Sequence, residues 1–197
     1  MRSLNEVIDT LSGKTVIVRA NYDVDVVDGI IQDTTRIEDS LETLQLLLSH
    51  GCKLVLLAHL GRPDGEAKPE FSLLPVRASL EKYLGEPVEF ITELDTDKFR
   101  NSPCRITLLE NLRYWTQEEE NDEQFAVKLA SFGDFYVNEA FANCHRKHAS
   151  IVALPKLLPH AAGLHLYHEI EILKKSRTNP DKPLVVVIGG SKVETKA

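Results

Sequence analysis

Each of three arginines in this chain follows a short apolar run, and arginine is a residue type that binds anions. The three pairs of run and arginine are 54–58 with Arg62, 106–109 with Arg113, and 134–137 with Arg146. If the runs are parallel strands of one sheet, their carboxyl ends meet at one edge, where open α/β sheets bind ligands. The planar donors of a guanidinium group match phosphate or carboxylate oxygens in pairs. The pattern therefore predicts an anion site at that edge.

Further polar residues are expected at the same edge. Arg19, Asn21 and Asp23 come directly after the first apolar run, and His59 comes after the second. An amide and a carboxylate can orient hydroxyl or carboxyl groups of a ligand, although Asn and Asp in loops also serve turns. His59, with an ordinary pKa of about 6.5, can donate to a phosphate or act as a general base, and we expect the donor role. Taken singly, each residue also fits a solvated loop, so the prediction rests on their shared position.

The other histidines and the cysteines give weaker signals. His160, His165 and His168 stand without matching carboxylates in the sequence and are interpreted as structural residues. The three cysteines are odd in number and show no Cys-x-x-Cys spacing, which indicates reduced thiols rather than a disulfide framework or a zinc site. Cys144 next to His145 is an alternative nucleophile, but no oxyanion-type motif accompanies it.

The composition is that of an ordinary globular protein of little more than one domain. Of the 197 residues, 43% are hydrophobic and 27% are charged, which excludes a disordered or fibrous chain. The formal net charge of -7 argues against a nucleic-acid partner, because surfaces that bind nucleic acid are basic. Acidic residues interrupt the N-terminal segment where a signal peptide needs an apolar core, and no apolar stretch reaches the roughly 20 residues of a membrane helix. We expect a cytoplasmic monomer with a small-molecule ligand and no membrane partner.

Apolar, β-branched runs alternate along the chain with segments of helical period. Strands are predicted at 15–18, 54–58, 88–91, 106–109, 134–137 and 184–188, and helices at 35–49, 73–84, 121–132 and 166–177. Near-continuous apolar strands separated by helices are typical of a parallel sheet covered on both faces, and right-handed crossovers place successive strand ends on one edge. The predicted fold is α/β: a three-layer Rossmann-like sandwich with a mainly parallel sheet and helices on both faces.

Local signals mark several boundaries. Asp33 or Thr34 can cap the first helix, whereas Ser72 can cap the second and Gly85 ends it. The pair at 28–29, Asp-Gly between two Val and two Ile residues, predicts a tight hairpin. After the last helix, the segment 179–183 contains two prolines and predicts a break before a new strand.

A glycine-rich segment follows that last predicted strand. Gly189-Gly190-Ser191-Lys192 allows close approach of a phosphate, and Lys192 and Lys196 supply positive charge. The segment matches neither the Walker pattern GxxxxGK[ST] nor the dinucleotide pattern GxGxxG. Alone, it is a weak signal for a phosphate cradle.

Taken in order, these motifs resemble the phosphoglycerate kinase family. The resemblance implies two α/β domains, of which the N-terminal one binds 3-phosphoglycerate or 1,3-bisphosphoglycerate and the C-terminal one binds Mg-ADP or Mg-ATP. Hinge closure would bring them together for direct phosphoryl transfer. The ordered set is specific and spans nearly the whole chain. Its segments are 18–19, 33–37, 59–63, 108–113, 145–150 and 189–193.

The resemblance implies which residues bind the substrate. Asn21 and Asp23 would contact the glycerate end, and Arg36 would lie near the transferring phosphoryl group, where it would also be catalytic. The triose phosphate would be held by His59, Arg62, Arg113 and Arg146.

The resemblance also implies the nucleotide contacts and the domain organisation. Lys192 would be catalytic by offsetting charge in the transition state, and Lys192 and Lys196 would contact nucleotide phosphates; no metal ligand is implied in this chain. Residues 1–166 would form the 3-phosphoglycerate-binding domain, 167–183 a hinge helix and linker, and 184–197 the first strand and phosphate loop of a truncated nucleotide-binding domain. We therefore expect the chain alone to be inactive, with a C-terminal nucleotide domain as its missing partner.

The loop after the first strand departs from the family pattern. The family reads Asp-x-Asn-Val-Pro, whereas residues 21–25 read Asn-Tyr-Asp-Val-Asp. The acid and the amide have exchanged places, and Asp25 replaces the proline. Asp25 adds negative charge near an anion site, which weakens anion binding unless its side chain points away.

Two other functions remain open on the sequence. A non-catalytic module that binds a phosphorylated ligand would keep the arginines without the chemistry. A nucleotide-dependent oxidoreductase would share the predicted fold, but the first strand is not followed by GxGxxG.

Overall fold

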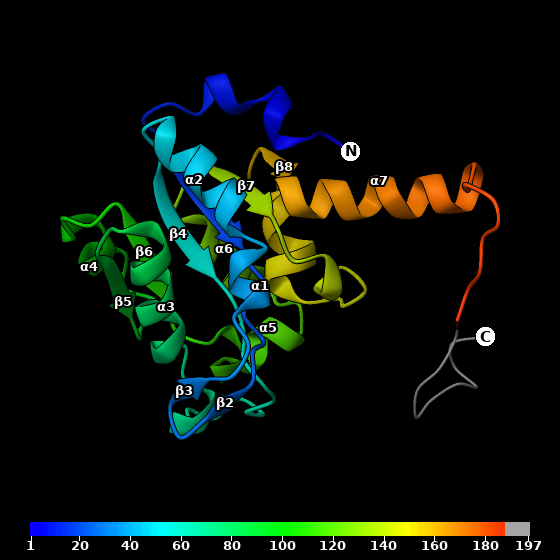
Figure 1. Cartoon of the computed structure of the whole chain (residues 1–197). Coiled ribbons are helices and arrows are strands. Elements are labelled where there is room, and N and C mark those ends of the chain that lie inside the picture. The colour runs from blue at the N-terminus through cyan, green and yellow to red at the C-terminus, as the bar shows by residue number, and fades with distance from the viewer. Residues whose placement is uncertain (188–197) are drawn as a thin grey trace.

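A six-stranded parallel sheet forms the centre of the computed structural model, which describes residues 1–187 (Figure 1). Its strand order is β5-β6-β4-β1-β7-β8, and every neighbouring pair runs parallel. The predicted α/β fold is confirmed. The strands are β1 (Thr15–Arg19), β4 (Lys53–Leu57), β5 (Val88–Ile91), β6 (Ile106–Leu109), β7 (Phe135–Asn138) and β8 (His160–Ala162).

The central strands are buried on both faces, which explains their continuous apolar sequence. In β1, Val16 and Val18 belong to one core, whereas Ile17 between them belongs to the other. In β4, Leu54 and Val55 are divided in the same way. Because successive side chains of a strand point to opposite faces, an unbroken apolar run requires a cover on each side.

Helices supply that cover. On the first face, α2 (Leu41–Ser49) and α3 (Leu74–Leu84) contribute buried leucines and a valine to one core. On the other face, α6 (Glu123–Ala130) packs Phe125 and Leu129 into the second core. The short helices are α1 (Thr35–Glu38), α4 (Thr96–Asn101) and α5 (Thr116–Glu119).

The last helix, α7 (Leu164–Thr178), projects from the body of the molecule (Figure 1). Leu166 in its first turn is the buried residue of this helix, and Leu164 packs against the first core. Ile172 and Leu173, further along, are about half exposed. The helix is therefore anchored to the sheet at its N-terminal end.

Most local signals in the sequence are confirmed. Gly85 ends α3 in the left-handed conformation with φ 67°. Residues 28 and 29 also have positive φ and join β2 (Val26–Val27) to β3 (Ile30–Ile31) in an antiparallel hairpin. Asp33 Oδ1 accepts a hydrogen bond from the Thr35 amide at 2.8 Å, so Asp33 rather than Thr34 satisfies the first turn of α1.

The predicted helix 35–49 is wrong in one respect, because it is divided. α1 ends at Glu38 and α2 begins at Leu41. At the junction, the Ser40 hydroxyl donates to the Ile37 carbonyl oxygen at 2.7 Å and lies 3.1 Å from the Tyr22 hydroxyl. A side chain that occupies a helical carbonyl competes with the backbone ladder.

The predicted strand 184–188 is also wrong where the structure describes it. Residues 184–187 belong to no strand, and each is exposed. An apolar run forms a strand when a neighbour takes up its amide and carbonyl groups, and no described residue pairs with this one. Residue 188, the glycine-rich segment, Lys192 and Lys196 lie outside the described residues.

Candidate functional site

Six of the predicted site residues lie on the loops after the carboxyl ends of four strands that are neighbours in the sheet, β6, β4, β1 and β7, and Arg36 lies in α1. The loop after β1 carries Asn21 and Asp23, and the loop after β4 carries His59 and Arg62; Arg113 follows β6, and Arg146 follows β7. The sheet topology alone therefore places these loops along one edge.

His59 is held by a buried arginine. The Arg19 side chain, at the end of β1, is completely buried, and its Nη2 atom lies 2.8 Å from His59 Nδ1. Because arginine can only donate, Nδ1 accepts and the ring proton resides on Nε2. Burial, followed by the charges of Arg19 and Arg113, lowers the pKa of His59. His59 is therefore a neutral donor whose N–H is on Nε2.

A buried carboxylate balances Arg19 through a serine. Arg19 Nε donates to Ser150 Oγ at 2.8 Å, and Ser150 Oγ in turn donates to Glu118 Oε1 at 2.5 Å. The Ser150 amide also donates to Glu118 Oε2 at 2.9 Å. Burial raises the pKa of Glu118, and the charge of Arg19 opposes that shift. The chain of contacts ties the end of β1 to the segment after β7.

Arg113 is almost completely buried and only partly satisfied. Its Nη1 atom donates to the Gly61 carbonyl at 2.6 Å, and Nε lies 3.3 Å from Glu119 Oε1. Neither Nε nor Nη2 has a hydrogen-bond partner among the described residues. An unsatisfied buried donor costs about 1–3 kcal/mol, so an acceptor at this position would be stabilising.

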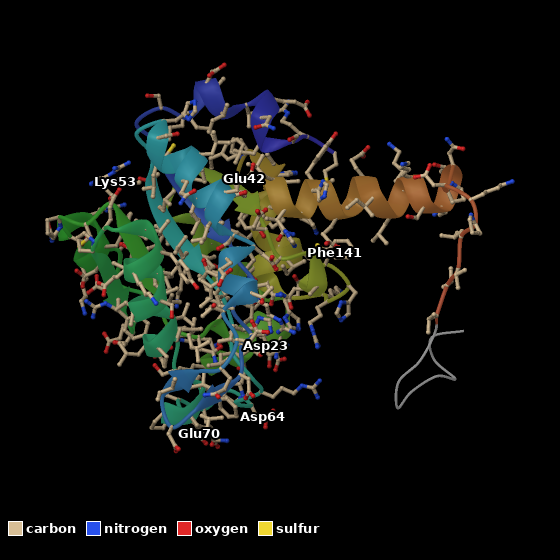
Figure 2. All side chains as sticks on the ribbon, viewed as in Figure 1. Asp23, Glu42, Lys53, Asp64, Glu70 and Phe141 are labelled. Carbon is tan, nitrogen blue, oxygen red and sulfur yellow. The ribbon has the colours of Figure 1, made fainter. Side chains whose placement is uncertain are left out.

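The Asp23 side chain, labelled in Figure 2, contacts the loop after β4 and α1. Its Oδ1 atom accepts from the Gly61 amide at 2.8 Å. Its Oδ2 atom lies 3.8 Å from both His59 Nε2 and Arg36 Nη1. Arg36 Nη1 also donates to the Asp23 carbonyl oxygen. Asp23 therefore links the loop after β1 to the loop after β4 and to α1.

The segment after β7 adds a second histidine. His148 is buried, with Nδ1 3.9 Å from Glu118 Oε1 and Nε2 3.9 Å from Glu119 Oε1. Burial, and then the charges of Arg113 and Arg146, lower the pKa of His148 to about 4. Arg146 also lowers the pKa of His59, which places its charge in the same neighbourhood. We call Arg19, Arg36, His59, Arg113, Arg146 and His148 the basic cluster.

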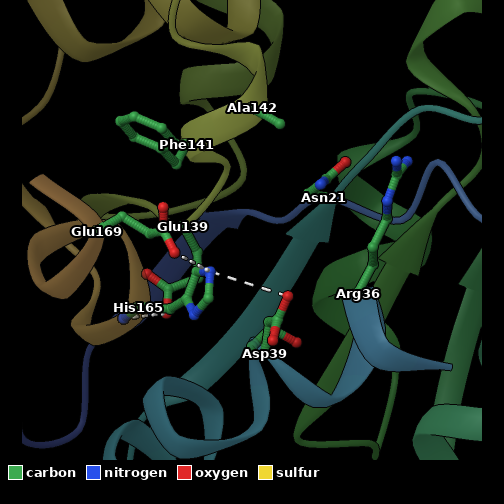
Figure 3. A pocket seen from close by; sticks show the side chains of 9 residues that line it. Asn21, Arg36, Asp39, Glu139, Phe141, Ala142, His165 and Glu169 are labelled. Atoms are coloured by element: carbon green, nitrogen blue, oxygen red, sulfur yellow. Dashed lines mark hydrogen bonds and ion pairs between the residues drawn. The ribbon is translucent and has the colours of Figure 1, made fainter. Parts of the chain in front are cut away.

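Two predicted residues stand apart from these contacts. Arg62 is exposed and forms no ion pair with the part of the chain that the structure describes. Asn21 lines a cavity of about 210 Å³ beside Arg36, and His165 and Glu169 of α7 line the same cavity (Figure 3). Asn21 therefore stands between the basic cluster and α7.

His165 has carboxylate partners, contrary to the sequence interpretation. Its Nε2 atom lies 3.8 Å from Asp39 Oδ2 and 4.0 Å from Glu169 Oε1 (Figure 3). Asp39 lies between α1 and α2 and is distant in sequence, so the packing of α7 against α2 creates this contact.

Cys144 is the alternative nucleophile that the sequence offers. Burial raises the pKa of its thiol, so formation of the thiolate that a nucleophile needs is disfavoured.

Glu118 and Ser150 were not predicted to support the site. Glu118 belongs to an acidic run at 118–120, which in sequence is typical of a solvated surface.

Among residues 1–187, no group of three or more His, Cys, Asp or Glu side chains has an arrangement that could hold a metal ion. No helix in that range is both long and apolar enough to span a membrane.

Comparison with known proteins gives a consistent family. The profile described as phosphoglycerate kinase matches residues 5–197. Phosphoglycerate kinase of Finegoldia magna is 42% identical over 196 residues, which are 94% of this chain and 49% of that protein. The Thermosipho africanus phosphoglycerate kinase is 46% identical over 191 residues, 94% of this chain and 48% of that protein.

Solved structures agree with the sequence relatives. Phosphoglycerate kinase from Coxiella burnetii superposes with a TM-score of 0.82 at 36% identity, over 94% of this chain and 48% of that one. The Pyrococcus horikoshii enzyme gives 0.87 at 28% identity, over 98% of this chain and 50% of that one. The chain spans about half the length of the curated relatives it matches. The profile match over nearly all of its residues establishes that the chain belongs to the phosphoglycerate kinase family.

Proposed function

We propose that this chain is the substrate-binding half of a phosphoglycerate kinase. The full reaction transfers a phosphoryl group reversibly between 1,3-bisphosphoglycerate and ADP, giving 3-phosphoglycerate and ATP. Arg113 is the observation that supports a phosphorylated ligand most strongly, because its Nη2 donor is buried without a partner among the described residues and its Nε makes only an ion-pair contact, to Glu119. Phosphate oxygens are acceptors of the kind that such a guanidinium group pairs with.

Each side chain has a distinct role in this proposal. His59 donates its Nε2 proton to the ligand without carrying charge, because Arg19 occupies Nδ1. The phosphate of the triose is held by Arg62, Arg113 and Arg146. Arg36 stabilises the charge that develops on the transferring phosphoryl group, and Asn21 and Asp23 contact the glycerate end. Phosphoryl transfer is catalysed mainly by positioning and charge neutralisation, which these residues supply without a covalent nucleophile.

The proposal assigns the nucleotide to residues beyond this site. Residues 1–166 bind the triose, residues 167–183 act as a hinge, and residues 184–197 begin the nucleotide-binding domain. Within that segment, Lys192 and Lys196 contact the phosphates of Mg-ADP or Mg-ATP. We assign the Mg²⁺ that accompanies the nucleotide to the nucleotide-binding domain, as the family resemblance implies.

Calorimetric titration with 3-phosphoglycerate tests the proposed site. We expect saturable binding to the unchanged chain and an affinity lower by about tenfold or more in Arg62→Ala, because a charge-assisted contact to phosphate is worth about 1.5–3 kcal/mol. Arg62 is exposed and unpaired among residues 1–187, so its removal leaves the fold intact. Arg105→Ala is the matched control, because Arg105 pairs with Glu86 before β6, at the opposite edge of the sheet.

Two results would contradict the assignment. One is an absence of binding by the unchanged chain. The other is an equal affinity in Arg62→Ala and in the unchanged chain. A loss of affinity in Arg105→Ala as large as that in Arg62→Ala would indicate nonspecific attraction to positive charge.

A further inference from the structure

The Asp23 carboxylate makes contacts of a kind that an anionic ligand would also make. Its Oδ2 atom lies 3.8 Å from the Nε2 atom of His59, the ring nitrogen that carries the proton. The same oxygen lies 3.8 Å from Nη1 of Arg36. The carboxylate is 40% exposed, so it lies at the opening of the site rather than in the core.

The Asp23 carboxylate also acts electrostatically on two buried arginines. Burial lowers the pKa values of Arg19 and Arg113. Asp23 is one of the groups that oppose this shift, after Glu118 for Arg19 and after Glu119 for Arg113. The negative charge of Asp23 therefore acts on the fully buried Arg19 and on Arg113, whose Nη2 donor has no partner among the described residues. A phosphate that approached Arg113 would be repelled by the same carboxylate. Two like charges about 4 Å apart repel each other by about 1 kcal/mol in water, and by more where water is partly excluded.

We propose that Asp23 is an internal competitor for the anion site, and that it limits the affinity for the phosphorylated acid. Its carboxylate stands beside the donor atoms of His59 and Arg36 when no ligand is bound. An anionic ligand must then displace that carboxylate or share these donors with it. This inference rests on the proposed function in that it takes a phosphorylated acid as the ligand. It revises one part of that function, because the Asp23 carboxylate opposes binding of the anion instead of adding a favourable contact to the glycerate end.

One atom of Asp23 has a separate structural role, which determines the variant to use. Oδ1 accepts from the Gly61 amide at 2.8 Å, and Gly61 has φ 60° in the turn that precedes Arg62. Asn at position 23 retains an acceptor oxygen for this amide and removes the charge. Asp23→Asn therefore separates competition from support of the turn.

Asp25 offers a matched control on the same loop. It is exposed, and its side chain forms no ion pair with any residue in the range 1–187. Its backbone carbonyl accepts from the Gln32 amide, a contact that substitution of the side chain preserves. Asp25→Asn changes the net charge by the same amount as Asp23→Asn, so any difference between the two variants reports position rather than total charge.

The experiment measures the affinity of each chain for 3-phosphoglycerate and for inorganic phosphate. We expect Asp23→Asn to bind both probes up to about fivefold more tightly than the unchanged chain, because the variant loses one partly exposed ion pair, with Arg36, of up to about 1 kcal/mol. Asp25→Asn should remain within about twofold, because water and salt screen an exposed charge. Thermal unfolding of each variant confirms that the chains compared are folded.

The outcomes separate the inference from the proposed function. If the unchanged chain binds 3-phosphoglycerate and Asp23→Asn binds no more tightly, the competitor role is wrong and the proposed function stands. A gain of affinity in Asp25→Asn equal to that in Asp23→Asn also overturns the competitor role. If neither the unchanged chain nor Asp23→Asn binds either probe, the proposed function fails and the competitor role fails with it.

Discussion

Two histidines in the basic cluster are kept neutral, and each remains neutral for the same physical reason. Burial disfavours the imidazolium form, and the nearby arginines disfavour it further. His59 can therefore donate through Nε2 without adding a charge to a cluster that already contains several. The guanidinium groups of the cluster stay charged and its imidazole donors stay neutral near neutral pH, so its attraction for an anion should change little there.

The low pKa of His148 predicts how stability depends on pH. The folded-state pKa of about 4 lies below the ordinary value of 6.5, so the unfolded chain binds the proton first as the pH falls. The contribution of His148 is fully present above about pH 6.5 and is lost as the pH falls towards about 4. Between about pH 7 and about pH 4.5, the unchanged chain should lose on the order of 1–2 kcal/mol more stability than His148→Asn.

Urea unfolding of both chains across this range is the measurement. Because other groups titrate in the same range, the difference between the two chains is the informative quantity. Parallel pH profiles for the unchanged chain and His148→Asn would contradict the prediction.

The sequence was sufficient to predict individual cations but not their partners. Arg113 and Arg146 were found because each follows an apolar run. Glu118 was not, because its buried position depends on Ser150 and Arg19, which lie far away in sequence. Burial of a charged residue is decided by tertiary contacts, which leave no local pattern.

At the scale of elements, one buried carboxylate connects β7, α2 and α7. Glu139 directly follows β7, and its Oε1 atom accepts from Thr43 Oγ1 of α2 at 2.6 Å. The same oxygen accepts from the His165 amide in the first turn of α7 at 3.0 Å. The Leu164 amide donates to Thr43 Oγ1 at 2.8 Å. Glu139 and Thr43 thus satisfy the amides at the start of α7, although neither belongs to that helix.

Gly163 makes this close contact possible, which leads to a prediction about stability. A Cβ atom at this position would overlap Glu139 Oε2. Gly163 has φ -66°, which alanine adopts without strain, so the penalty would come from the steric clash alone. We expect Gly163→Ala to destabilise the chain by about 2 kcal/mol or more, because it displaces a buried, hydrogen-bonded carboxylate.

Gly13→Ala provides the contrasting control for this measurement. Gly13 has φ 73° and no atom within 4 Å of the added Cβ position, so its substitution carries backbone strain without a clash. That strain should cost about 1 kcal/mol. In urea unfolding, a smaller loss in Gly163→Ala than in Gly13→Ala would show that Glu139 does not require the glycine.

The elements of the fold were predicted correctly where burial in the structure leaves a regular apolar pattern in the sequence. Strands β1, β4, β6 and β7 were found because their apolar runs are buried on both faces, and the edge strand β5 was found although only its two end residues are buried. The three-residue strand β8 was missed, because a short edge strand carries too few residues to show a pattern. Residues 184–187 have the composition of a strand without a neighbour to pair with, so composition alone led to the wrong prediction.

At the scale of the whole molecule, the sheet topology explains why distant residues share a site. The loops after β6, β4, β1 and β7 meet because these strands are consecutive in the sheet, although not in the sequence. The family relatives are about twice as long as this chain. In the proposed function, another part of a longer protein presents the second substrate at this open edge.

Mapping the ligand onto the backbone is the most direct test of this account. In an NMR titration of the unchanged chain with 3-phosphoglycerate, the amides of Gly61, Arg113 and Arg146 should shift with a common saturation curve. The amides of Gly51 and Gly133, which precede β4 and β7 at the opposite edge, should stay in place. Shifts centred on that opposite edge, or no saturable shifts at all, would contradict the claim that the basic cluster binds the phosphorylated substrate.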